Sequence, residues 1–261
     1  MSRQPLLAKI SFGTFVAGAL IALAACAGPR LEVWAPDVGL KVLVPGLAVG
    51  FVGLTFGAAW VWRALALNNS MGWRLGTIGL IGSLVLIGIP ANHVWHIYTL
   101  PPIHDVSTDI GDAPQFVALL AARQGAPNPP GYDGPVFVTY SGEKMTTALA
   151  QKNTWQDIKP LEKLAGTIPQ HEFVGKYFWR ALNAVNGLGW KVVAFDVKSG
   201  RIEATSTTLW FGTVSDIVIR VRPAGKIGVR VDIRAKSHTG VSDAGRNAKL
   251  VRDFLAREDG H

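Results

Sequence analysis

The sequence contains a single cysteine, Cys26, which lies in an apolar run near the N-terminus. The part of the chain after residue 100 has none, so no disulfide can form within it, and about 160 residues can bury a sufficient core without one. Charge is scarce at the start: only 2 of the 18 acids and 6 of the 26 lysines and arginines precede residue 100. The remaining residues leave about +4, which is too mild to indicate a nucleic-acid-binding protein.

Sequence signatures of catalysis are also scarce. His171-Glu172 begins like a zinc-protease motif, but Gly175 stands where the second histidine belongs. Residues 240–245 contain a serine between glycines, although the spacing does not match a nucleophile elbow. This segment is better interpreted as a turn in which Ser242 or Asp243 caps the last helix. No phosphate-binding glycine loop occurs, and we predict no catalytic residues and no cofactor.

His104, Asp105 and Asp109 lie close together in the sequence and could ligate a metal ion, although nothing in the sequence fixes their geometry. A loop that anchors itself with polar side chains explains these residues better, so no metal is predicted. The alternative of a hydrolase would use Asp216, Asp232 or Asp243 as acid or base, with His238 or His104. It would require a concave pocket and a strongly shifted carboxylate.

Long uncharged runs dominate the first hundred residues. They predict transmembrane helices at about residues 10–28, 42–62 and 75–97, within a membrane region of residues 1–99. Aromatic residues gather near the predicted helix ends, as in an aromatic belt: Trp34, Trp60, Trp62, Trp73, Trp95 and Tyr98.

Basic residues in the short loops predict the orientation. The N-terminal tail carries Arg3 and Lys9 and the second loop Arg63 and Arg74, with no acid in either, whereas the segment after the third span begins with acids. By the positive-inside rule, the tail lies in the cytoplasm, and three spans place residues 100–261 outside it. We therefore expect a multi-pass plasma-membrane protein with its N-terminus in the cytoplasm, whose C-terminal domain is periplasmic if the source is a Gram-negative bacterium.

Two features of the membrane region leave alternatives open. The first run could instead be a cleaved signal peptide, and the residues before Cys26 resemble a lipoprotein processing site. The second run contains Gly46, Gly50, Gly53 and Gly57 at four-residue spacings, which allow helices to approach closely. These glycines indicate either homo-oligomerisation or packing within the three-helix bundle of one chain.

The C-terminal part shows both helical and strand periodicity. Apolar residues from Phe173 to Val185 recur at helical spacing, and alternation then predicts strands at residues 190–197, 201–208, 216–222 and 227–236. Further expectations are helices at residues 112–123, from Thr154 and from about Asp243 to Arg257, and a strand at residues 135–140. The predicted class is α+β, with a mainly antiparallel four- or five-stranded sheet packed by helices on one face.

One face of the predicted sheet is charged. Ile217, Ile219 and Val221 alternate towards the core, as do Val229, Val231 and Ile233. The opposite face carries Asp216, Arg220, Arg222, Arg230, Asp232 and Arg234, joined by Glu203. This pattern indicates either a docking face for an anionic group or a solvated surface of ion pairs that contribute little stability.

Several polar and glycine positions agree in order with a known family. The matching elements are Ile103 to Asp109, Arg201 to Ala204, Phe211-Gly212, Asp216 to Val221, Val231 to Arg234, Ser237, and residues 240–248 with Gly240, Ser242, Asp243, Gly245, Asn247 and Ala248. In these elements the chain resembles the family catalogued as domain of unknown function 1499. The resemblance covers most of residues 100–257 and implies a bacterial envelope protein with a membrane-anchored domain, without supplying a reaction.

These observations predict a non-enzymatic envelope protein that binds a partner protein or an anionic ligand. The predicted binding residues are Arg220, Arg222, Asp232, Arg234, Asp243 and Asn247. The arginines would contact the anion, and the aspartates would hold them in place. A third hypothesis is a structural subunit of a larger membrane complex.

Overall fold

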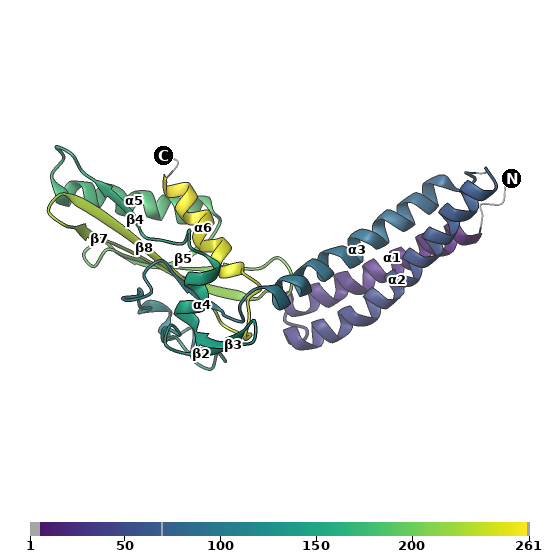
Figure 1. The fold of residues 1–261 in the computed structure, drawn as a ribbon, viewed down its shortest axis with the longest axis horizontal. Coiled ribbons are helices and arrows are strands. Elements are labelled where there is room, and N and C mark those ends of the chain that lie inside the picture. The colour runs from purple at the N-terminus through teal and green to yellow at the C-terminus, as the bar shows by residue number, and fades with distance from the viewer. Residues whose placement is uncertain (1–5, 69, 260–261) are drawn as a thin grey trace. The chain divides into compact units, whose positions relative to one another are not determined.

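The computed structural model describes residues 6–68 and 70–259, so Arg3, which was used to predict the orientation, lies outside the described residues. The chain forms two compact units, which are described separately (Figure 1). The first unit contains the residues up to Trp95 together with the loop Thr208–Gly212. The second contains His96–Thr207 and the residues from Thr213 onward.

The first unit is built from α1 (Leu6–Arg30), α2 (Pro36–Ala66) and α3 (Trp73–Thr99). All three helices are long and apolar enough to cross a membrane. A helix pairs its backbone N–H and C=O groups within one segment, as a span through hydrocarbon requires. The three predicted spans are therefore confirmed as helices, and the chain is a membrane protein.

The glycines of α2 lie against the other helices of the same bundle. A Cβ atom added at Gly50 would come within 2.7 Å of Leu86, and one added at Gly53 would come within 2.5 Å of Ser83 Oγ. Gly46 faces α1 and Gly57 faces α3 in the same way. The structure thus uses these glycines for packing within one chain, and self-association through them stays a prediction.

The second unit contains one six-stranded antiparallel sheet. Its strands are β1 (Asp105–Ser107), β4 (Leu161–Leu164), β5 (Lys191–Asp196), β6 (Arg201–Thr207), β7 (Val214–Ala224) and β8 (Gly228–Ser237). The order is β1-β8-β7-β6-β5, and β4 also pairs with β8. The four long strands match the predicted ones, while β1 and β4 are short strands that local alternation did not reveal.

Helices cover one face of this sheet, as predicted for an α+β domain. These are α5 (Gln170–Gly187) and α6 (Arg246–Asp259), and Figure 1 shows both on the same side of the strands. The core between helices and sheet contains Phe178, Val185, Ile219, Ile233 and Phe254, each at most 1% exposed. The predicted inward-facing residues of β7 and β8 are thus confirmed as core.

The segment between β1 and β4 corrects two predictions and confirms a third. Residues 112–123 do not form a helix, and only the 3-10 turn η1 (Ala118–Leu120) is present. Pro114 disfavours a helix there, and the side chain of Glu203 on β6 caps the 3-10 turn instead. Thr154 ends a helix rather than starting one, since α4 (Thr147–Thr154) is capped by Thr146, whose hydroxyl accepts a bond from Leu149 N. The predicted strand at 135–140 is β2 (Phe137–Tyr140), which pairs with β3 (Glu143–Thr146) in a separate hairpin.

Candidate functional site

The charged side chains of the sheet come from neighbouring strands and share one face, opposite α5 and α6. Register places these residues there together: Arg201, Glu203, Asp216, Arg220, Arg222, Arg230, Asp232, Arg234 and Lys236. Because residues that lie opposite each other on adjacent antiparallel strands project from the same face, the sheet brings the charges into contact range. This polar face carries six basic and three acidic groups.

Residues 108–134, called here the covering segment, lie across the polar face. Phe116 and Leu119 pack on Val218, which forms a small apolar cluster within this face. With β1, the segment adds the acids Asp105, Asp109, Asp112 and Asp133 and the base Arg123. An excess of three positive charges on the face thus meets an excess of three negative charges. The polar face is therefore covered and neutralised, which the sequence alone did not decide.

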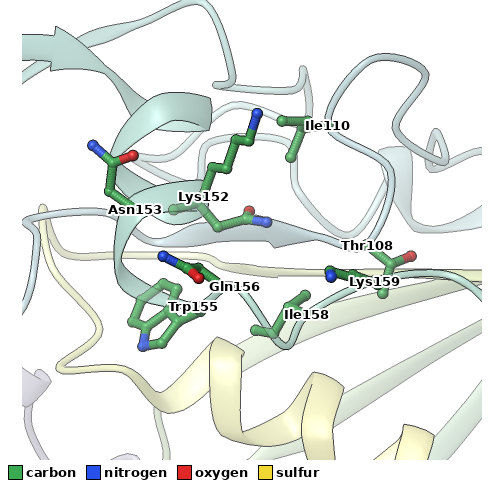
Figure 2. Close-up of a pocket in the computed structure, with 9 residues that line it drawn as sticks. Thr108, Ile110, Lys152, Asn153, Trp155, Gln156, Ile158 and Lys159 are labelled. Carbon is green, nitrogen blue, oxygen red and sulfur yellow. The ribbon is translucent and has the colours of Figure 1, made fainter.

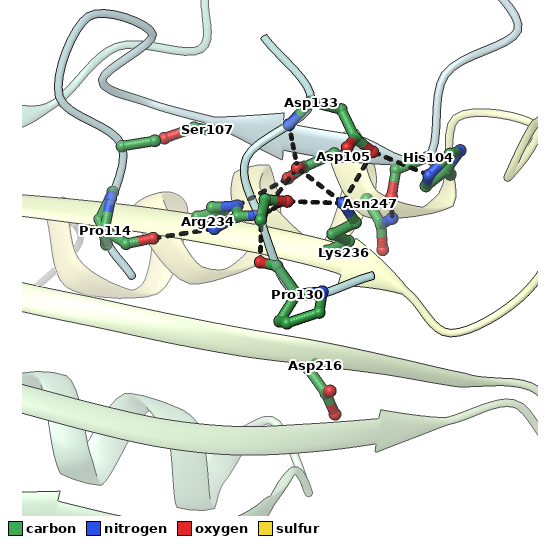
Figure 3. A network of polar contacts seen from close by, with 12 residues as sticks. His104, Asp105, Ser107, Pro114, Pro130, Asp133, Asp216, Arg234, Lys236 and Asn247 are labelled. Atoms are coloured by element: carbon green, nitrogen blue, oxygen red, sulfur yellow. Dashed lines mark hydrogen bonds and ion pairs between the residues drawn. The ribbon is translucent and has the colours of Figure 1, made fainter. Parts of the chain in front are cut away.

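Arg234 occupies the centre of the covered face and is completely buried. Its Nε and Nη2 atoms each lie 2.8 Å from one oxygen of Asp105, so the pair is bidentate (Figure 3). The guanidinium also donates to the carbonyl oxygens of Pro114 and Gly131. Arg234, a predicted anion-binding residue, thus holds the covering segment in place instead of facing solvent.

Lys236 lies next to this pair and is also buried. Its Nζ atom is 2.7 Å from Asp133 Oδ2 and donates to Gly131 O, while His104 Nε2 lies 2.9 Å from the same carboxylate oxygen (Figure 3). Burial lowers the pKa of His104, but bonds to Asp133 and to Val241 O more than offset it, so the pKa lies above its ordinary value.

Glu203 explains the local path of the covering segment. This carboxylate is 1% exposed and accepts the backbone N–H groups of Val117, Ala118 and Leu119 at 2.9, 3.1 and 2.9 Å. A carboxylate at the start of a helical turn satisfies donors that have no partner within the turn. Glu203 therefore holds η1 in place, although Glu203 and Leu119 are 84 residues apart in the sequence. No local sequence motif predicts this contact.

Asp216 and His238 form the arrangement closest to the hydrolase hypothesis, with 2.8 Å between His238 Nε2 and Asp216 Oδ2. Arg123 Nη1 lies 2.8 Å from the same oxygen, and Arg123 also donates to Ser237 O. The Asp216 carboxylate is completely buried, and the pocket described below is not lined by this pair. The pair anchors the covering segment through Arg123.

Arg220 and Arg222 reach the edge of the covered face, where their side chains are 22% and 37% exposed. Both contact the buried carboxylate of Asp232 and the exposed carboxylate of Asp112. Both arginines also contact Asp109 Oδ2. Burial acts to raise the pKa of Asp109, but backbone N–H bonds and nearby arginines favour its charged form, so the pKa lies below its ordinary value. The structure thus brings the predicted residues Arg220, Arg222 and Asp232 together. Both arginines are already paired with carboxylates.

Asp243 and Asn247 lie apart from that cluster, in the turn before α6. The two carboxylate oxygens of Asp243 accept Gly245 N and Asn247 N, both at 2.8 Å, so the prediction that this turn caps the last helix is confirmed. Burial raises the pKa of Asp243 to about 6. Asn247 Nδ2 donates to His104 O and Ser237 Oγ, which ties α6 to the strand β8.

A pocket of about 380 Å³ lies beside α4, outside the covered face (Figure 2). The lining residues are Thr108, Ile110, Gln151, Lys152, Asn153, Trp155, Gln156, Ile158 and Lys159. In Figure 2, Lys152 extends from α4 towards Ile110, and Lys159 lies beside Thr108. This group of residues, called here the lysine pocket, was not singled out from the sequence, because its members come from two separate segments, residues 108–110 and 151–159.

The lysine pocket differs from the covered face in having no acid in its lining. Two carboxylates are adjacent in sequence to lining residues, and both are paired elsewhere. Asp157 binds Arg252, with 2.7 Å between Oδ1 and Nη2, and Asp109 Oδ2 lies 2.6 Å from Arg230 Nη2. Across residues 6–68 and 70–259, neither Lys152 nor Lys159 has an ion-pair partner. Two cationic groups are therefore available there to an incoming anion.

Fold and site together define a membrane-anchored α+β domain with an internally neutralised ionic layer. The family described as "Protein of unknown function (DUF1499)" matches residues 105–257, and the chain belongs to this family. The resemblance seen in the sequence is thus confirmed. No curated protein matches the chain closely enough to indicate a relative. Among the described residues, no group of three His, Cys, Asp or Glu side chains is placed to hold a metal ion.

Proposed function

We propose that this protein is a non-enzymatic envelope protein whose membrane-anchored domain binds an anionic group in the lysine pocket. One observation carries this proposal: Lys152 and Lys159 line a pocket without a carboxylate, whereas every basic side chain of the polar face has an acidic partner. An anion entering the pocket displaces only water, but on the polar face it would have to displace an existing partner.

The lining of the pocket suits a small anionic ligand or an acidic segment of a partner protein. The side-chain amides of Asn153 and Gln156 can donate to oxygen atoms next to the two ammonium groups. Ile110 and Ile158 provide apolar surface for the body of the ligand. A volume of about 380 Å³ falls within the usual range for small-molecule sites, about 300–1,000 Å³.

Localisation in the bacterial plasma membrane, with the C-terminal domain in the periplasm, is part of the same proposal. The basic residues Lys9, Arg63 and Arg74 in the tail and second loop support it through the positive-inside rule. Reporter fusions after residue 105 test it: periplasmic reporters should be active there. Activity of cytoplasmic reporters alone would contradict the orientation.

Binding is tested by native mass spectrometry of the intact protein extracted in mild detergent. We expect a discrete adduct on the wild type that is lost from the Lys152→Gln/Lys159→Gln variant. The mass separates a small ligand from a co-purifying protein. The matched control is Lys198→Gln/Lys226→Gln, which removes the same charge from exposed lysines outside the pocket. An adduct retained by the pocket variant would overturn the proposed site.

The same experiment tests the residues predicted from the sequence. An Arg220→Ala/Arg222→Ala variant should keep the adduct, because both guanidinium groups are already paired with Asp112 and Asp232. Loss of the adduct from this variant alone would move the binding site to the edge of the covered face.

A further inference from the structure

β5 is the outermost strand of the six-stranded sheet and pairs only with β6. Among the described residues, its other edge has no strand partner. Large apolar side chains lie exposed along it: Val193 is 43% exposed, Phe195 51%, and Trp179 of α5, whose ring centroid is 6.2 Å from that of Phe195, 50%. An open strand edge beside exposed aromatic residues is a typical surface for adding another strand.

A β-bulge at Val193 changes which side chains of β5 share a face. Lys191 lies opposite Thr205 and Asp196 lies opposite Arg201, with a register shift between Val192 and Ala194. In a regular strand, residues five positions apart face opposite sides, but the extra residue of the bulge brings Lys191 and Asp196 to the same side.

The same shift brings Val192 and Phe195 together on the helix-covered side, where they lie opposite Ala204 and Ile202. Charged and apolar positions are therefore arranged symmetrically about the middle of β5, with opposite charges at its two ends. One face carries a base at the start and an acid at the end, and the other face carries an apolar residue near each end. A strand with this symmetry is complementary to an antiparallel copy of itself.

We propose that the β5 strands of two copies of this chain pair antiparallel about a two-fold axis, which joins two sheets edge to edge. Lys191 then lies opposite Asp196 of the second copy, and Val192 lies opposite Phe195 of the second copy. Each contact occurs twice, as a two-fold axis requires. This proposal does not depend on the lysine pocket and extends the proposed function to the assembly of the protein.

Anchoring in a membrane favours such a contact, because it confines both copies to two dimensions and raises their effective concentration. Main-chain hydrogen bonds of the two edges would supply affinity, and the Lys191–Asp196 pairs would fix the register. A lysine and a bulge on an edge strand can also act to prevent pairing. Exchanging the charges of Lys191 and Asp196 shows whether these residues promote or prevent pairing of the two edges.

The test measures the dimer fraction of the intact protein in mild detergent by native mass spectrometry. Lys191→Asp places acids opposite Asp196, and Asp196→Lys places lysines opposite Lys191, so each variant should weaken the dimer by about tenfold or more. The exchanged variant Lys191→Asp/Asp196→Lys should restore it. The two single variants, mixed, should form a heterodimer, because every facing pair is then of opposite charge.

Two controls keep the outcome interpretable. Lys226→Asp makes the same charge change at an exposed lysine outside β5 and should leave the dimer unchanged. Asp196 also accepts Lys198 N at 3.0 Å, so the unfolding temperature of each variant is measured alongside. A monomeric wild type, or a dimer indifferent to every exchange, would overturn the proposal. Rescue by the exchanged variant and by mixing would establish it.

Discussion

The covered polar face and the lysine pocket are both rich in charge, yet they use it in opposite ways. On the polar face, buried Arg234 meets the buried carboxylate of Asp105 from β1, and buried Lys236 meets Asp133 from the covering segment. In the lysine pocket, Lys152 and Lys159 have no acid among the lining residues. Charges that are desolvated and paired must stay paired for the domain to remain folded, whereas unpaired charges in water are available to a ligand.

Breaking the central pair of the polar face should have the largest effect. Arg234→Ala leaves the buried carboxylate of Asp105 without its bidentate partner, which we expect to lower the free energy of unfolding by about 3–5 kcal/mol. Urea unfolding of the wild type and the variant measures this loss. The matched control is Arg252→Ala, which breaks an exposed bidentate pair with Asp157 and should cost about 1 kcal/mol or less. Equal losses in both variants would refute the distinction between the two kinds of pair.

Glu203→Gln should have the next largest effect. An amide in place of the carboxylate turns an NH₂ group towards at least one of the backbone donors of Val117, Ala118 and Leu119. We expect a loss of about 1–3 kcal/mol in the free energy of unfolding and earlier proteolysis of the covering segment. Glu162→Gln, which alters an exposed partner of Arg230, serves as the control and should change stability by less than about 1 kcal/mol. An unaltered cleavage pattern for Glu203→Gln would show that the cap does not hold the segment.

Glu258, which belongs neither to the polar face nor to the lysine pocket, should make stability depend on pH. Burial raises the pKa of Glu258 to about 7, with Arg180 acting in the opposite direction. Because the folded state favours the protonated acid, this contribution to stability is present below the ordinary pKa of glutamate and is lost as pH rises through about 7. Glu258→Gln should therefore gain about 1–2 kcal/mol relative to the wild type between pH 5 and pH 8. Denaturant unfolding at both pH values measures the difference, and a constant difference would contradict the assignment.

The smallest effect on stability is expected in the lysine pocket. Lys152→Gln/Lys159→Gln removes no ion pair of the described residues and should change the free energy of unfolding by less than about 0.5 kcal/mol. Thermal unfolding measures this change alongside the loss of the bound adduct. A loss of stability comparable with that of Arg234→Ala would show that the pocket lysines belong to the folded core.

Local patterns predicted much of this architecture. The uncharged runs predicted α1, α2 and α3, and alternation predicted β5 to β8 together with the inward direction of Ile219 and Ile233. The covering segment was poorly predicted, since residues 112–123 form only a 3-10 turn whose cap comes from Glu203 on a distant strand. The acids of this segment were visible in the sequence, but their pairing with the arginines of β7 and β8 depends on register.

The sequence alone predicts which face of the sheet is charged, because side-chain direction in a strand follows from position alone. It likewise determined the three membrane helices, since length and the absence of charge suffice for that assignment. The burial of Arg234 against Asp105, and the lack of an acid beside Lys152 and Lys159 in the pocket lining, are seen in the folded chain and could not be predicted from the sequence. Whether a charge is available to a ligand depends on which distant segment lies over it. Contacts between residues more than a hundred positions apart, such as Asp105 and Arg234, produce no local sequence pattern.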